Sequence, residues 1–135
     1  METEQELYSG ESEFLQGLGA SPGKYTGKAR VVRKPEDYLK LEYGDVVIAN
    51  RVDFNMSPFL SLAGAVVTET GGPLAGCAAI AREASIPSVA SVKNACSRIE
   101  GGKPITVDGA SGRVWLKPHK DEGKLREGGE ATDGD

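Results

Sequence analysis

The residues best suited to chemistry lie in one stretch of the sequence, from Thr68 to Glu83. The apolar run at 63–67 predicts a buried strand, and the alanine-rich residues 76–84 predict a short helix that packs by one face on a sheet. Gly71 and Gly72 lie between them and permit a tight turn. The first amide groups of the helix therefore point into this turn, where they favour a phosphate or a carboxylate.

Four residues of this turn and helix could bind a phosphate: Thr70, Gly71, Gly72 and Arg82. Threonine hydroxyls and turn amides donate hydrogen bonds to oxyanions, and an arginine adds a charge-assisted contact. A purely structural interpretation stays open. Turns between strands and helices often need glycine, threonines cap such turns, and Arg82 beside Glu83 suits an exposed ion pair.

Cys77 is the candidate nucleophile, because it falls in the first turn of the predicted helix. Oriented amides can lower the pKa of a thiol at this position and raise its thiolate fraction. The alternative is that Cys77, which is followed by two alanines, is a small core residue. Neither Cys77 nor Cys96 has CxxC spacing or a nearby histidine, so no metal site and no disulfide framework is predicted.

Shorter motifs flank this stretch in a fixed order. Residues 18–23 (LGASPG), 27–32 (GKARVV) and 44–48 (GDVVI) precede the turn, and residues 81–83 (ARE), 86–87 (IP) and 107–109 (VDG) follow it. Together they resemble the swivelling, or mobile, phosphohistidine domain of PEP-utilising enzymes such as pyruvate phosphate dikinase, phosphoenolpyruvate synthase and rifampin phosphotransferase. The resemblance covers residues 17–115 and implies an α/β fold with the swivelling β/β/α architecture of that family.

The resemblance also exposes a departure at the reactive position. The family carries its phosphoryl group on a histidine four residues after the second glycine and six before the arginine, and both counts give Gly76. Ala75, Gly76 and Cys77 stand where the family has Ser-His-Ala. Glycine has no side-chain atom that accepts phosphate, so the resemblance predicts the fold better than the reaction.

Two classes of function follow. The first is a stand-alone, degenerate mobile-domain homologue, which acts as a binding or regulatory subunit beside an ATP-grasp or PEP-binding partner and takes a phosphate-bearing ligand at most. The second is a catalytic component that shuttles a phosphoryl or acyl group on Cys77. A swivelling subunit of the aconitase-type dehydratases shares the architecture, although no motif here selects it. No cofactor is predicted.

Composition indicates one folded domain with acidic ends. The chain has 135 residues, 39% of them hydrophobic, and a net charge of −4. Residues 1–13 hold five acids and no base, and residues 118–135 hold six acids and three bases, which leaves +4 for the domain at 14–117. Both ends are predicted to be disordered, with His119 an exposed histidine of the tail.

Several partner classes are not favoured by the sequence. Aromatic residues are only 6% of the chain and no basic run occurs, so nucleic acid is not expected. No apolar run approaches the roughly 20 residues of a membrane helix, and the acidic start lacks the pattern of a signal peptide. The expected location is the cytoplasm.

The remaining sequence predicts strands interleaved with short helices. Strands are expected at 27–33, 45–50, 86–92, 104–107 and 113–116. A helical turn is expected at 35–41, a helix that begins with Ser57 and Pro58 at 57–62, and another at 93–99.

Overall fold

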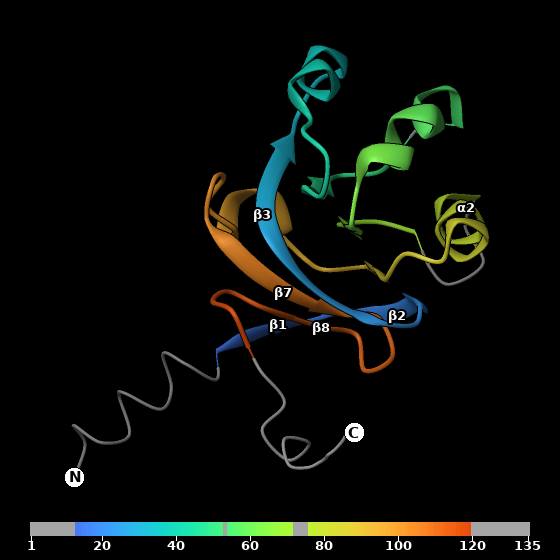
Figure 1. Ribbon diagram of the computed structural model, residues 1–135. Helices are drawn as coiled ribbons and strands as arrows, with labels where there is room; N and C mark the ends of the chain where they lie inside the picture. Colours follow the sequence, from blue (N-terminus) through green and yellow to red (C-terminus); the bar gives the residue numbers. More distant parts are fainter. Residues whose placement is uncertain (1–12, 53, 72–75, 120–135) are drawn as a thin grey trace, which may run out of the picture.

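The computed structural model describes residues 13–52, 54–71 and 76–119. Within them the chain forms eight strands and four short helices (Figure 1). The strands are β1 (Phe14–Gln16), β2 (Leu18–Ser21), β3 (Lys24–Val32), β4 (Val46–Ala49), β5 (Ala65–Thr68), β6 (Ser88–Ala90), β7 (Pro104–Asp108) and β8 (Arg113–Trp115). The helices are the 3-10 helices η1 (Pro35–Lys40) and η2 (Phe54–Leu62) and the α-helices α2 (Gly76–Ala84) and α3 (Ala95–Arg98).

The strands pair in the order β1-β8-β7-β3-β4-β5-β6-β2. β3, β4, β5 and β6 are parallel, whereas β3-β7, β7-β8, β8-β1 and β6-β2 are antiparallel. β1 and β2 occupy opposite ends of this order, yet only Gly17 separates them in the sequence. The sheet therefore curls back on itself, with the nine-residue β3 shared by its two halves (Figure 1).

Three glycines make this closure possible: Gly17, Gly19 and Gly109. We call them the glycine seam. A Cβ on Gly17 would lie 2.5 Å from the carbonyl oxygen of Ala90, and Cβ atoms on Gly19 and Gly109 would overlap the carbonyl oxygens of Gly109 and Ser21. Real Cβ atoms do not approach backbone so closely, so only glycine fits at the seam.

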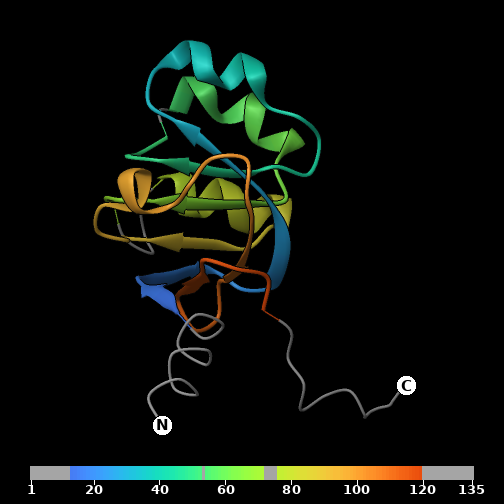
Figure 2. The ribbon, with the colours of Figure 1, turned by 90° about the vertical axis from the view of Figure 1, so that its left-hand side faces the viewer.

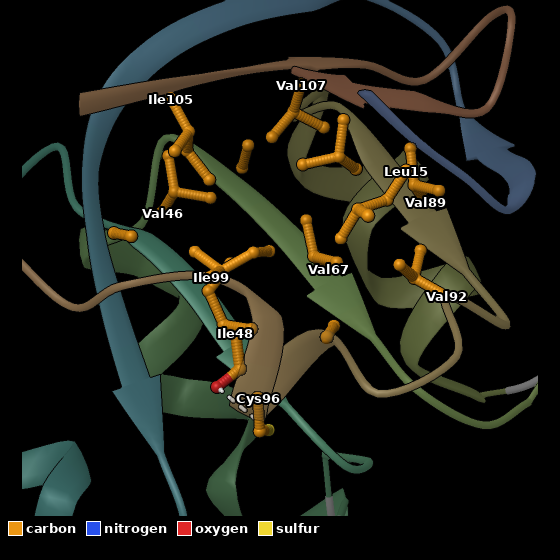
Figure 3. Packing of buried hydrophobic residues seen from close by; sticks show 14 residues of the cluster. Leu15, Val46, Ile48, Val67, Val89, Val92, Cys96, Ile99, Ile105 and Val107 are labelled. Atoms are coloured by element: carbon orange, nitrogen blue, oxygen red, sulfur yellow. Dashed lines mark hydrogen bonds between the residues drawn. The ribbon is translucent and has the colours of Figure 1, made fainter. Parts of the chain in front are cut away.

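The main core fills the space between the two halves of the curled sheet (Figure 3). Val46 and Ile48 of β4 point into it, whereas Val47 and Ala49 point to a second core beneath η1 and η2. Because both faces of β4 and β5 are buried, these strands are continuously apolar, as is typical of parallel strands covered on both sides.

Three helices, η1, η2 and α2, form the outer layer, whereas α3 packs on the main core. η1 and η2 lie side by side at the top of the view in Figure 2 and cover the second core. α2 packs on β2, β6 and η2, with Ala78 and Ala81 buried and Arg82 and Glu83 exposed. Two sheet layers and one helical layer confirm the predicted β/β/α architecture of α/β class.

The structure corrects three local predictions. η2 begins at Phe54 and not at Ser57, and Pro58 lies inside it. The strands β1 and β2 were not predicted, because they are short and interrupted by glycine. His119 is half-buried and not an exposed tail residue, since its ring stacks on Trp115 at 3.8 Å and its N–H donates to the Thr106 hydroxyl at 2.8 Å.

The predicted acidic tails fall almost wholly outside the described residues, which begin at Glu13 and end at His119. The longest described helices, η2 and α2, have nine residues each. Neither they nor any other described helix has the length and apolar character needed to cross a membrane.

Candidate functional site

One polar residue follows the end of each parallel strand. Arg33, Asn50, Glu69 and Ser91 each follow directly after β3, β4, β5 and β6. The register aligns the last residues of β3, β4 and β5, so these four residues form a row, which we call the carboxyl edge. Ligands of α/β sheets bind at this end of the strands, because loops and helix starts gather there.

The predicted turn begins at the carboxyl edge. Gly71 has φ +91°, a conformation that favours glycine, as the sequence predicted for this turn. Thr70 is tied to the carbonyl oxygen of Asn50, to which its N–H and its hydroxyl both donate at 3.0 Å. Thr68 donates to the carbonyl of Thr70 at 2.9 Å, and Ser91 donates to the carbonyl of Gly71. These bonds fix the start of the turn, because both threonine hydroxyls donate to backbone carbonyl oxygens.

The other predicted site residues lie beyond the turn. Gly76 and Cys77 are the first two residues of α2, as expected, although the contacts of the Cys77 side chain and the whole of Gly72 lie outside the described residues. Arg82 donates from Nη1 to the carbonyl oxygen of Ala20 in β2 at 2.9 Å. The structure therefore brings Thr70 and Gly71 together with Asn50 and Ser91, and it ties Arg82 to the edge strand.

Glu69 is the centre of a network that sequence reasoning missed. Its Oε1 accepts a hydrogen bond from the side-chain amide of Asn50 at 2.9 Å, and its Oε2 accepts one from the N–H of Cys96 at 2.8 Å. The Asn50 amide is the largest cause of a pKa of Glu69 below its ordinary value, followed by the Cys96 N–H. The carboxylate therefore stays ionised and joins the ends of β4 and β5 to α3.

Cys96 and Arg33 complete this network. Arg33 donates from Nη2 to the carbonyl of Cys96 at 2.7 Å, and the Cys96 thiol lies 3.9 Å from the carbonyl oxygen of Ile48 (Figure 3). Burial, and then the Glu69 charge, raise the pKa of Cys96 to about 11. Cys96 is thus a thiol at neutral pH and not a nucleophile.

A signal for this network was present in the sequence. A polar residue directly after each of several consecutive parallel strands is brought to one edge by the register, and Arg33, Asn50 and Glu69 fit that pattern. Within the described part of the chain, no three His, Cys, Asp or Glu residues are grouped so that they could hold a metal ion.

Comparisons with known proteins agree with this geometry. The model of the family described as "PEP-utilising enzyme, mobile domain" matches residues 41–112. The probable phosphoenolpyruvate synthase of Archaeoglobus fulgidus is 37% identical over 102 residues, and the prodigiosin synthesizing transferase PigC of Serratia marcescens is 38% identical over 108 residues. These matches cover 76% and 77% of this chain, but only 14% and 12% of the two relatives.

A solved structure shares the fold. The crystal structure of Thermococcus kodakaraensis aconitase X superposes with a TM-score of 0.59 over 77% of this chain and 98% of the matched chain. Sequence identity is 20%, so this likeness concerns the architecture alone. It fits the curled sheet with one helical layer, which PEP-utilising mobile domains and the aconitase-type dehydratases were expected to share.

Proposed function

The chain belongs to the family of the PEP-utilising enzyme mobile domain, and on this premise we propose that it is a homologue degenerate for phosphohistidine transfer, which serves as a binding or regulatory component of a partner enzyme. The observation that carries the proposal is Gly76. It is the first residue of α2, at the position where the family resemblance implies the phosphorylated histidine. A glycine offers no imidazole nitrogen to accept a phosphoryl group.

The proposed partner is a subunit with an ATP-grasp or PEP-binding domain, because the chain spans 14% or less of the two relatives compared above. Relatives of such size carry further domains, and the proposal assigns the nucleotide or PEP chemistry to a partner of that kind. The carboxyl edge is the proposed docking face, since it adjoins the turn that leads to Gly76 and presents polar groups held in fixed positions.

The turn itself is proposed to receive a phosphate or carboxylate of the partner or its ligand. Thr70, Gly71, Gly72 and Arg82 would surround it, with α2 contributing its N-terminal amides. Thr70 would hold the turn in place and not donate to the anion, because its N–H and its hydroxyl both donate to the carbonyl oxygen of Asn50. The proposed setting is the cytoplasm, which suits the free thiol of Cys96.

The test is transfer of phosphate to the domain. Wild-type protein is incubated with ATP and the nucleotide-binding domain of a phosphoenolpyruvate synthase, and intact mass is measured before and after acid treatment. We expect no phosphate on wild type or on Gly76→Ala, which adds a side chain without an acceptor atom. Gly76→His, once shown to be folded by circular dichroism, is expected to gain an acid-labile phosphate.

Three results would contradict the proposal. Acid-labile phosphate on the wild type would show that a histidine still accepts it, and His119 is the only histidine in the chain. A phosphoryl adduct located to Cys77 would instead establish the shuttle on a thiol. A folded Gly76→His variant that gains no phosphate would show that the domain does not dock with this class of partner.

A further inference from the structure

A cationic hollow lies between η1 and the ends of β3 and β4. Its volume is about 160 Å³, and it is lined by Val32, Arg33, Lys34, Pro35, Tyr38, Asn50 and Arg51. This lining contains three cations and no acid. The volume suits one compact anionic group and not a whole drug-sized ligand, for which pockets of about 300 Å³ or more are usual.

Two of these cations keep donors available for a ligand. Among the described residues, the Arg33 side chain donates one hydrogen bond, from Nη2 to the carbonyl of Cys96. Within the same part of the chain, no hydrogen bond or salt bridge reaches Nζ of Lys34. The neighbouring acid, Asp37, is engaged by the backbone N–H groups of Arg33 and Lys34 at 2.9 and 3.2 Å, and its other oxygen lies 3.9 Å from Lys40. Asp37 thus fixes the backbone of the hollow, and the Arg33 and Lys34 side chains can donate charge-assisted bonds to an anion.

A second hollow adjoins the first across Arg33 and Asn50. Its volume is about 340 Å³, and it is lined by Val32, Arg33, Asn50, Glu69, Cys96 and Ser97. Glu69 accepts two hydrogen bonds from the protein, whereas a carboxylate has about four acceptor positions. An ionised carboxylate repels a second anion and accepts hydrogen bonds from hydroxyl groups, and Ser97 adds a hydroxyl beside it. The first hollow therefore favours an anionic group, and the second, on the other side of Arg33, favours hydroxyl groups.

We propose that the two hollows together bind one small phosphorylated polyol, with its phosphate between Arg33 and Lys34 and its hydroxyl groups at Glu69 and Ser97. The cationic hollow and the acceptor-rich hollow share Val32, Arg33 and Asn50 in their linings, so a phosphate in the first hollow can be joined directly to a sugar-sized group in the second. The inference shares Arg33, Asn50 and Glu69 with the proposed docking face, but it goes beyond that function because it assigns a small-molecule ligand and uses neither the turn at Gly71 nor Gly76.

The test compares three probes by two-dimensional NMR: ribose 5-phosphate, inorganic phosphate and ribose. Ribose 5-phosphate is expected to shift the amide signals of Lys34, Asn50 and Ser97 with a Kd on the order of 1 mM. Inorganic phosphate is expected to bind several-fold more weakly and to shift Lys34 but not Ser97, while ribose alone leaves the spectrum unchanged.

A pair of matched variants locates the site. Lys34→Met is expected to weaken ribose 5-phosphate about tenfold, since it removes one charge-assisted contact to the phosphate. Lys103→Met changes another exposed lysine, which lines neither hollow, and is expected to leave the affinity unchanged. Both lysines are exposed, so both variants should fold, which thermal unfolding verifies.

Three outcomes would overturn the inference. No shift at Lys34, Asn50 and Ser97 would show that the hollows are empty surface. Equal weakening by Lys34→Met and Lys103→Met would show diffuse attraction to basic residues. Ribose 5-phosphate that binds no better than inorganic phosphate would show a plain anion site without recognition of the polyol.

Discussion

The glycine seam and the carboxyl edge are two regions of the sheet that are built in opposite ways. At the seam, backbone approaches backbone so closely that Gly17, Gly19 and Gly109 leave no room for a side chain. At the carboxyl edge, polar side chains cross from strand to strand and hold one another, as Asn50 holds Glu69 and Glu69 holds Cys96. The seam has no room for a side chain that could bind or react, whereas the edge contains charged groups in defined positions.

The contrast separates what the fold requires from what a function could use. The seam closes the curled sheet, and any change there should act on stability. The carboxyl edge adds some stability, but its cation Arg33 and its ionised carboxylate Glu69 line surface hollows. A substitution at the edge should therefore change binding as well as stability, and the following predictions test that separation.

The largest effect is expected at the seam. In Gly109→Ala the new Cβ would overlap the carbonyl oxygen of Ser21, so β2 must move away from the loop between β7 and β8. Urea denaturation should show a loss of about 3 kcal/mol or more, in the range of overpacked sites. The matched control is Gly101→Ala, whose Cβ would meet only Val31 at 3.7 Å and should change stability by no more than about 0.5 kcal/mol. Equal stability of the two variants would refute the closure by glycine.

A smaller effect is expected in the Glu69 network. Glu69→Ala leaves the Cys96 N–H and the Asn50 amide without their acceptor, which should cost about 1–2 kcal/mol in urea denaturation. Glu100→Ala removes an exposed carboxylate for which the described residues show no side-chain bond, and should cost less than about 0.5 kcal/mol. If Glu69→Ala were as mild as this control, the network would not join α3 to the strands.

The pH dependence of this stabilisation has a definite sign. Hydrogen bonds from Asn50 and Cys96 hold the pKa of Glu69 below its ordinary value of 4.5. Because the folded pKa is depressed, the contribution is fully present above the unfolded value and is lost as the pH falls through the folded one. The stability difference between wild type and Glu69→Gln should be constant at pH 6–7 and shrink below about pH 4.5. A difference that grows on acidification would contradict the assigned bonds.

The smallest change is expected at Cys96. A pKa of about 11 leaves roughly one thiol in a thousand ionised at pH 8, and the side chain is buried. Peptide mapping after iodoacetamide treatment should therefore find Cys96 unmodified in the folded protein and modified after denaturation. Fast modification of Cys96 in the folded state would mean that α3 opens readily from the core.

The sequence was sufficient for the regions in which local pattern and tertiary structure agree. The apolar runs that became β4 and β5 and the alanine-rich α2 were all predicted, because burial on both faces or on one face leaves a clear pattern. Gly71 was correctly predicted to serve a turn. The short strands β1 and β2 were not predicted, since their stability comes from closure of the sheet and not from the propensity of residues such as Gly19.

The site was predicted less completely for a physical reason. Residues next to the turn in sequence were identified, but Arg33, Asn50 and Glu69 come from three different strands and meet only through the register. Arg82, predicted as a phosphate contact, bonds to Ala20 of β2, a strand whose position the sequence did not indicate. Long-range pairing thus decided which polar groups became neighbours.

The most direct test of the account is an NMR footprint of partner binding on the folded domain. Isotope-labelled protein is titrated with the unlabelled nucleotide-binding domain of a phosphoenolpyruvate synthase, and the amide signals are followed. The account predicts that the signals of Arg33, Asn50, Glu69 and Ser91 shift or broaden, while those of Gly17, Gly19 and Gly109 do not. Changes centred on the glycine seam, or no changes at all, would contradict the claim that the carboxyl edge is the binding face.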